Sequence, residues 1–198
     1  MEVRPVTLEG VRAKLVPLTE EHLPDLLTAA QSPLIWAYMP TNLQTEESVQ
    51  QWYQDALRAQ EAGTEVVFVI VDKETGRAVG STRFMDISAP NRGLEIGWTW
   101  LAPDVWRTRI NTECKYLLLK HCFETLGAIR VQLKTDSRNL RSQKAMERLG
   151  AVREGVLRRH RILPDGYVRD SVYYSILPQE WEEVKKRLER FLTRLPTC

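Results

Sequence analysis

The residues best placed to bind a ligand lie in a short polar segment between an expected strand and an expected helix. Residues 130–134 alternate between apolar and polar, as in a half-buried strand, and residues 135–139 supply turn and cap chemistry. From Ser142 onward, apolar residues recur every three or four positions, which predicts a helix that ends at Gly150. Polar groups at the end of a strand beside a helix N-terminus are where α/β proteins tend to hold phosphates and ligand amides.

Length and composition predict one globular domain that spans residues 1–198, with 43% apolar and 27% charged residues. The 28 Lys and Arg residues nearly balance the 26 Asp and Glu residues, which argues against nucleic acid or an anionic membrane as a partner. The longest apolar run, residues 66–71, is far shorter than the roughly 20 residues of a membrane helix. The N-terminus lacks the basic start and apolar block of an export signal, so we expect a cytoplasmic protein.

The three cysteines, Cys114, Cys122 and Cys198, form neither an even disulfide set nor a C-x-x-C metal-ligand pair. Reduced thiols are therefore the favoured interpretation, and we expect no metal. A nucleophilic cysteine would need an activating histidine, but His121, the neighbour of Cys122, points elsewhere on a helix.

The rest of the chain alternates between expected strands and helices, which predicts a mixed α/β fold. Strand patterns occupy residues 11–18, three stretches within residues 65–102, and residues 152–157 and 169–177; helix patterns occupy residues 19–30, 48–57, 111–126 and the tail from Trp181 to Leu195. Residues 32–47 form a loop rich in aromatics. Its Trp36 and Tyr38 either form a binding wall or fill the core under the loop, and both alternatives stay open.

The motif N-x-x-S-x-x-A-x-x-x-L-G-A-x-x-E-G, residues 139–155, resembles the GNAT superfamily of acyl-CoA-dependent N-acetyltransferases, and within it the RimJ/RimL-like branch. DGYVRDSVYYSIL (residues 165–177) and EIGW (residues 95–98) are similar to further segments of that branch. The similarity runs through nearly the whole chain. It implies a single-domain GNAT-like α/β (α+β mixed) fold: a mixed, mostly antiparallel sheet of about seven strands, splayed between strands 4 and 5 and flanked by helices.

The implied fold places the pantetheine arm of acetyl-CoA in the wedge between the splayed strands. On this chain the fourth strand is Glu95 to Leu101, and its main chain offers hydrogen-bonding groups to the arm at Trp98, Thr99, Trp100 and Leu101. The alternative for Trp98 and Trp100 is aromatic packing on one face of the sheet.

The resemblance also implies that the loop before the helix at residues 111–126 holds the pyrophosphate. This loop contains Trp106, Arg107, Thr108, Arg109, Ile110, Asn111 and Thr112. The family pattern is (Q/R)-x-x-G-x-(G/A), so Arg109 and Asn111 occupy the two small positions, and Arg107 stands where related sequences commonly have glycine. Either Arg107 and Arg109 turn their guanidinium groups onto the phosphates, or their side chains fill the loop and weaken binding.

The resemblance implies that Asn139 lies near the pantetheine and Ser142 near the thioester sulfur. Met146 occupies the position where many members have a tyrosine that protonates the departing thiolate. Ser142 could instead only cap the helix. The best candidate for a general base is Glu95, which could equally be a cross-strand ion-pair partner.

A carboxylate that some branch members have after E-G-x-x-R is replaced by RRHR, Arg158 to Arg161, and His160 there is not a favoured base. This basic cluster, read with Arg138, Arg141 and Arg169, is most simply a solvated face. It could alternatively grip the adenosine 3′-phosphate or an acidic protein surface.

Together these features predict an acetyl-CoA-dependent N-acetyltransferase, without a metal, that transfers the acetyl group by direct attack of a primary amine through a tetrahedral intermediate. The acceptor is a protein N-terminus or a small molecule, and the protein is a monomer or homodimer. The alternative is a non-catalytic acyl-CoA-binding or sensory module, suggested by the missing tyrosine and the arginines in the loop.

Overall fold

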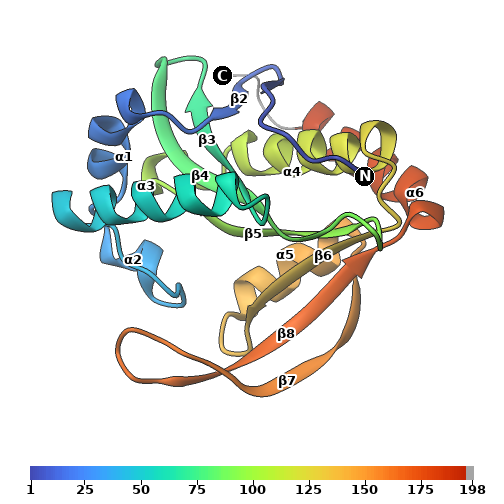
Figure 1. Ribbon diagram of the computed structural model, residues 1–198. Helices are drawn as coiled ribbons and strands as arrows, with labels where there is room; N and C mark the ends of the chain where they lie inside the picture. The colour runs from blue at the N-terminus through green and yellow to red at the C-terminus, as the bar shows by residue number, and fades with distance from the viewer. Residues whose placement is uncertain (195–198) are drawn as a thin grey trace.

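One sheet of eight strands, in the order β1-β2-β3-β4-β5-β6-β8-β7, runs through the computed structural model, which describes residues 1–194 (Figure 1). Within the described residues, β5 and β6 are the only parallel neighbours, and every other pair is antiparallel. The strands are β1 (Leu8–Glu9), β2 (Ala13–Pro17), β3 (Val66–Asp72), β4 (Arg77–Ser88), β5 (Gly93–Leu101), β6 (Arg130–Asp136), β7 (Val152–Ile162) and β8 (Val168–Ile176).

Helices cover both faces of the sheet and enclose one hydrophobic core on each. They are α1 (Leu23–Ala29), α2 (Pro33–Trp36), α3 (Glu46–Glu61), α4 (Ile110–Lys120), α5 (Leu140–Leu149) and α6 (Pro178–Arg194). Side chains of α1, α2 and α3 share one core with Val67 and Val69, whereas α4, α5 and α6 share the other with Val66, Phe68 and Ile70. Alternate residues of β3 therefore enter opposite cores, because successive strand side chains point to opposite faces. This explains why β3 is an unbroken apolar run.

The structure confirms the expected mixed, mostly antiparallel sheet and adds one strand to it. The extra strand is the two-residue β1, so the fourth strand of the sequence analysis is β5 in Figure 1. The predicted loop at residues 32–47 contains the one-turn helix α2. The helix expected over residues 111–126 is divided, since a π-helical turn at His121–Thr125 follows α4. Leu195 and Cys198 lie outside the described residues.

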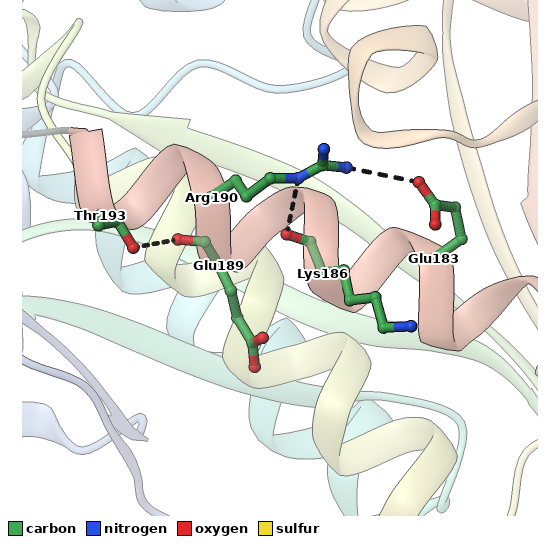
Figure 2. A pocket seen from close by; sticks show the side chains of 5 residues that line it. All are labelled: Glu183, Lys186, Glu189, Arg190 and Thr193. Carbon is green, nitrogen blue, oxygen red and sulfur yellow. Dashed lines mark hydrogen bonds and ion pairs between the residues drawn. The ribbon is translucent and has the colours of Figure 1, made fainter.

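The final helix α6 packs on the body through one apolar side and presents the other to solvent. Trp181, Val184 and Leu188 are buried, as the helical spacing predicts. On the outer side, Thr193 Oγ1 donates a hydrogen bond to the carbonyl of Glu189 at 2.8 Å, and Arg190 forms a 3.5 Å ion pair with Glu183 (Figure 2). None of the helices within residues 1–194 has both the length and the apolar character needed to cross a bilayer.

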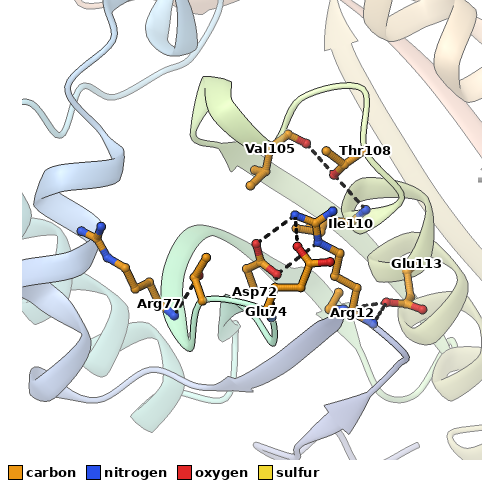
Figure 3. Close-up of polar contacts among 10 residues, drawn as sticks. Arg12, Asp72, Glu74, Arg77, Val105, Thr108, Ile110 and Glu113 are labelled. Carbon is orange, nitrogen blue, oxygen red and sulfur yellow. Dashed lines mark hydrogen bonds and ion pairs between the residues drawn. The ribbon is translucent and has the colours of Figure 1, made fainter. Parts of the chain in front are cut away.

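A buried carboxylate on α4 fixes the N-terminal strand region against this helix. Glu113 accepts hydrogen bonds from the main-chain N–H groups of Val11, Arg12 and Ala13 at 2.9, 2.8 and 2.6 Å. Figure 3 shows Glu113 beside Arg12. A Cβ atom at Gly10 would lie 2.5 Å from the Glu113 carboxyl carbon, so only glycine permits this approach. The N-terminus of α4 is therefore held in place by residues about one hundred positions away in the sequence.

Candidate functional site

The two parallel strands separate soon after they meet. Residues 93–95 of β5 pair with residues 130–132 of β6, and no later residues of the two strands pair with each other. Beyond this point β5 continues along β4 as far as Leu101, and β6 continues along β8 as far as Asp136. The facing edges therefore open into a wedge, which confirms the predicted splay.

A cavity of about 600 Å³ occupies this wedge and extends to α2, α4 and α5. Of the predicted site residues, the cavity is lined by Glu95, Trp98, Thr99, Trp100, Leu101, Trp106, Arg107, Asn111, Thr112, Asn139 and Ser142. The other predicted residues, Thr108, Arg109 and Ile110, are not among its lining. The structure thus gathers most of the candidates in one cavity, and their roles in binding remain predictions.

A β-bulge shapes the wall that β5 contributes. Gly97 and Trp100 of β5 pair with Arg83 and Ser81 of β4, so β5 has one more residue than β4 between these two pairs. Within this bulge, Trp98 adopts a left-handed φ of 48°. The Trp98 ring lies under the guanidinium of Arg83, 4.4 Å from it, whereas Trp100 packs on Trp36 with ring centroids 5.2 Å apart. The two tryptophans therefore have separate packing partners, although both also line the cavity.

One residue of the loop before α4 has a backbone conformation that favours glycine. Arg107 adopts φ 63°, the left-handed conformation that glycine accommodates without strain. The structure therefore places an arginine in a conformation that favours glycine, although residues with a Cβ atom adopt it less readily. The exposed Arg107 side chain lines the cavity beside the N-terminal turn of α4.

Arg109 does not turn toward the cavity, which corrects one part of the two-arginine hypothesis. Its side chain is buried in an ion pair with Glu113, at 3.3 Å between Nη2 and Oε1. A buried guanidinium is costly unless it is paired, and Glu113 supplies that pairing. Thr108 also has a structural contact, since its hydroxyl donates to the Val105 carbonyl at 2.7 Å and accepts from Ile110 N–H at 3.3 Å (Figure 3).

At the start of α5, Asn139 and Ser142 have different tasks. Asn139 is the N-cap, and its side-chain oxygen accepts a hydrogen bond from the Ser142 N–H at 3.1 Å. Ser142 is therefore not the helix cap, and the alternative that it only solvates the first turn stays open. Its half-buried side chain lines the cavity, in the same first turn as Asn139.

Glu95 is the most deeply buried charged group of the site, with no exposed surface. Its Oε2 accepts a hydrogen bond from Gln132 Nε2 at 2.7 Å and lies 3.0 Å from Lys134 Nζ. Its Oε1 is buried without any hydrogen-bond partner in the described residues. Burial raises the pKa of Glu95 against the opposing attraction of Lys134. Glu95 thus forms the cross-strand ion pair through one oxygen, while its second oxygen is buried without a hydrogen-bond partner among the described residues.

Lys115 is a site residue that the sequence analysis missed. It lines the wedge from α4, and its Nζ donates to Thr99 Oγ1 at 3.0 Å. Burial lowers the pKa of Lys115 to about 8, so an appreciable fraction is neutral near physiological pH. The signal in the sequence is the four-residue spacing from Asn111, which places the two side chains on one side of the helix.

The far wall of the cavity comes from the segment around α2 and from the β7–β8 hairpin. Trp36 is buried, which confirms core packing for this residue, whereas Tyr38 is exposed and lines the cavity, where a binding role stays a prediction. Arg138, from the loop after β6, lies 5.3 Å from the ring of Tyr38 and 3.5 Å from the ring of Tyr167 in the hairpin turn. Three segments distant in sequence therefore meet at one guanidinium.

A second hollow, on the outer side of α6, is a weaker candidate for a site. It is lined by Glu183, Lys186, Glu189, Arg190 and Thr193, all side chains of one helix that lie toward solvent (Figure 2). Exposed ion pairs of this kind are screened by water. The hollow offers no buried polar group to a ligand, unlike the cavity in the wedge.

Comparison with known proteins shows similarity to acetyltransferases. A family model described as "Acetyltransferase (GNAT) domain" matches residues 12–152. A curated relative from Bacillus subtilis (strain 168), named "Putative ribosomal N-acetyltransferase YdaF", is 33% identical over 110 residues, which cover 56% of this chain and 59% of that protein. The match thus spans less than two thirds of the relative's length.

Solved structures share the fold along nearly the whole chain. A structure described as a "putative acetyltransferase from T. thermophilus" is 41% identical, with a TM-score of 0.87 over 97% of this chain and 100% of that one. "Mycobacterium smegmatis RimJ in complex with CoA-disulfide" has a TM-score of 0.80 over 98% of each chain. At 21% identity, the likeness to this second structure shows the fold alone.

Proposed function

Because the chain belongs to the GNAT acetyltransferase family, we propose that it is an acetyl-CoA-dependent N-acetyltransferase that modifies a primary amine by direct attack. The observation that carries this proposal is the position of Glu95. A buried carboxylate with one unpartnered oxygen lines a wedge between strands that have separated. Such an orphaned acceptor costs free energy in the resting protein and is expected where a ligand completes it.

The residues around the wedge suit coenzyme A. The unpaired edges of β5 and β6 can hydrogen-bond to an amide-rich arm. The N-terminus of α4 and the exposed arginines at positions 107 and 141 offer N–H groups and positive charge to phosphates. Acetyl-CoA would supply the activated acyl group, and the chain itself would position and deprotonate the acceptor.

Glu95 acts as the general base in this proposal. An amine attacks only as the neutral species, so a proton has to leave its nitrogen. The free Oε1 can accept that proton, while Gln132 and Lys134 fix the other oxygen. The raised pKa of Glu95 brings it closer to the pH at which a base works well.

Ser142 acts in this proposal as the hydrogen-bond donor on the opposite wall. Met146 also lines the cavity but has no proton to give. The Ser142 N–H is already engaged by the cap Asn139, so the side chain is the part of this residue directed to a ligand. We assign it to the departing thiolate.

The acceptor is a protein N-terminus or a small amine. The name of the Bacillus subtilis relative supports testing peptides from ribosomal protein N-termini first. In this proposal the acceptor-binding wall is the part of the cavity lining that comes from the segment around α2 and from the β7–β8 hairpin: Leu34, Ile35, Tyr38, Met39, Pro40, Arg161 and Arg169.

Calorimetric titration with acetyl-CoA, followed by a thiol-release assay with amines and peptides, tests the proposal on the full chain. We expect binding, turnover with at least one acceptor, and loss of turnover in Ser142→Ala with cofactor affinity retained. Glu182→Gln, an exposed change on α6, should leave both unchanged. Tight binding without turnover on any acceptor would instead identify a non-catalytic acyl-CoA-binding module.

A further inference from the structure

Two arginines face each other across the β7–β8 hairpin. Arg161 and Arg169 are paired in the register of the two strands, and both line the cavity. Like charges directly opposite each other in an antiparallel pair are destabilising. Arg169 is only 5% exposed, so water screens this repulsion poorly.

Neither arginine has the contacting counterion that a buried guanidinium normally requires. Within residues 1–194, no carboxylate lies at ion-pair distance from Arg161 or Arg169. Asp136 and Glu95 attract Arg169 from a longer distance, but Asp136 is already paired with Arg138 and Glu95 with Lys134. Arg169 Nε donates to Ser171 Oγ at 3.0 Å, and Arg161 Nε is buried without a hydrogen-bond partner among the described residues. The expectation that this basic cluster is a solvated face is therefore wrong for Arg169. An anion between the two guanidinium groups would supply both the missing negative charge and a hydrogen-bond acceptor.

The arginine pair lies on the same face of the sheet as Glu95. On β8, Val172 and Tyr174 enter the core under α4 and α6. Side chains alternate between the two faces of a strand, so Arg169, three residues before Val172, points to the opposite face. On β5, Leu94 and Ile96 enter that same core, so Glu95 also faces away from α4. The N-terminus of α4, where phosphates are expected, lies on the opposite face. The pair is thus placed for the acceptor and not for the cofactor phosphates.

The charge of the cavity points to the same ligand. Glu95 is the one carboxylate among the described residues that line it, and Lys134 already neutralises this carboxylate. The acceptor end therefore carries the surplus positive charge of Arg161 and Arg169. A planar carboxylate matches the fork of a guanidinium and adds only one negative charge near Glu95.

We propose that Arg161 and Arg169 form a carboxylate-binding site for the acceptor, so that the substrate is an amine carrying a carboxylate on the same molecule. Either a free amino acid or a peptide with an acidic side chain near its N-terminus offers this chemistry. This inference rests on the proposed acetyltransferase function. It goes further by assigning the two arginines to substrate selection.

Matched acceptors test the site on the full chain. One arm compares free amino acids with their C-terminal amides, and a second compares peptides that have Glu with peptides that have Gln at the second position. We expect kcat/KM to favour the carboxylate acceptor of at least one arm by about tenfold or more. The arm that shows the preference identifies the source of the carboxylate.

Arg169→Gln and Arg161→Gln should reduce that preference toward one, mainly through KM. Arg169→Lys should retain part of it. The control is Arg158→Gln, which removes an exposed arginine of the same hairpin that does not line the cavity. The thermal melting temperature of each variant shows whether it still folds. Because Arg161 is less buried than Arg169, Arg161→Gln should disturb folding less and still test recognition of the carboxylate.

Equal kcat/KM for carboxylate and amide acceptors in both arms would overturn the carboxylate site and leave the acetyltransferase proposal intact. If no acceptor turns over, calorimetry with the carboxylate acceptors decides the point. Binding that Arg169→Gln abolishes supports the site, and no binding at millimolar concentration overturns it. Failure of the proposed function is separate, since it appears as absence of acetyl-CoA binding or of any turnover.

Discussion

The two faces of the wedge offer different kinds of group to a ligand. On the α4 and α5 side, the groups offered to a ligand are main-chain N–H groups, a helix N-terminus and exposed arginines. On the other side they are the side chains of Glu95, Arg161 and Arg169, brought together from three strands. The first face can accept side-chain changes as long as the backbone keeps its shape, whereas the second depends on each charge.

Arg107 illustrates the tolerance of the first face. It occupies a position where related sequences commonly have glycine, and it adopts a left-handed backbone conformation that glycine accommodates without strain. Glu95 illustrates the opposite behaviour, because its two oxygens have different surroundings and only one has protein partners. We therefore expect substitutions on the second face to have the larger effects on catalysis.

The largest effect should come from Glu95→Gln. Loss of the general base should lower kcat about 10²–10⁴-fold at neutral pH. The wild-type rate should fall with decreasing pH as Glu95 becomes protonated. Because burial raises the pKa of Glu95, this fall should begin above the usual carboxyl range of about 4.3. A pH profile of kcat at saturating acceptor measures both effects.

In Glu95→Gln the acidic limb of that profile should disappear, while the dissociation constant of coenzyme A stays within about threefold of wild type. An unchanged limb in the variant would show that the titrating base is another group. Retained coenzyme A binding separates a lost base from a damaged wedge.

A smaller effect should distinguish main chain from side chain at position 107. Arg107→Gly relieves the left-handed conformation of a residue with a Cβ atom, so the free energy of unfolding should rise by about 0.5–1 kcal/mol. Arg107→Ala keeps that conformational cost and should be less stable than Arg107→Gly. If the main chain carries phosphate binding, both variants should bind coenzyme A less than about tenfold more weakly than wild type.

Thermal denaturation and calorimetry compare the two variants. A loss well above tenfold in both would show that the guanidinium, and not the loop backbone, holds the cofactor.

The smallest effect should be seen at two core cysteines, Cys114 on α4 and Cys122 in the π-helical turn that follows it. Cys114 and Cys122 are buried, and burial raises the pKa of Cys114 to about 12 and that of Cys122 still further. Because thiolates are the reactive species, neither should be alkylated by iodoacetamide in the native protein at about pH 8. Peptide mass spectrometry after labelling, with a denatured sample as control, locates the modified thiols. Rapid native labelling of Cys114 would mean that α4 opens.

Local patterns predicted the elements of this fold well and their junctions less well. The unbroken run of β3 and the helical spacing of α6 were recognisable because burial repeats with the period of the backbone. The π-helical turn after α4 and the bulge at Trp98 were not, since each inserts a residue whose effect depends on the partner strand or helix. Arg109 was assigned to the phosphates because its buried partner Glu113 could not be recognised as such from local spacing.

The amino-acid sequence by itself determined which strands and helices form, the order in which they follow, and the similarity to acyl-CoA-dependent enzymes. Periodicity, caps and short motifs depend on residues close together in the chain, so they can be recognised from the sequence without the tertiary structure. Only the tertiary structure decided that β5 and β6 part after three residue pairs, that Glu95 keeps a free oxygen, and that Arg161 opposes Arg169. These features arise from strand register and burial, which depend on contacts between segments far apart in the chain.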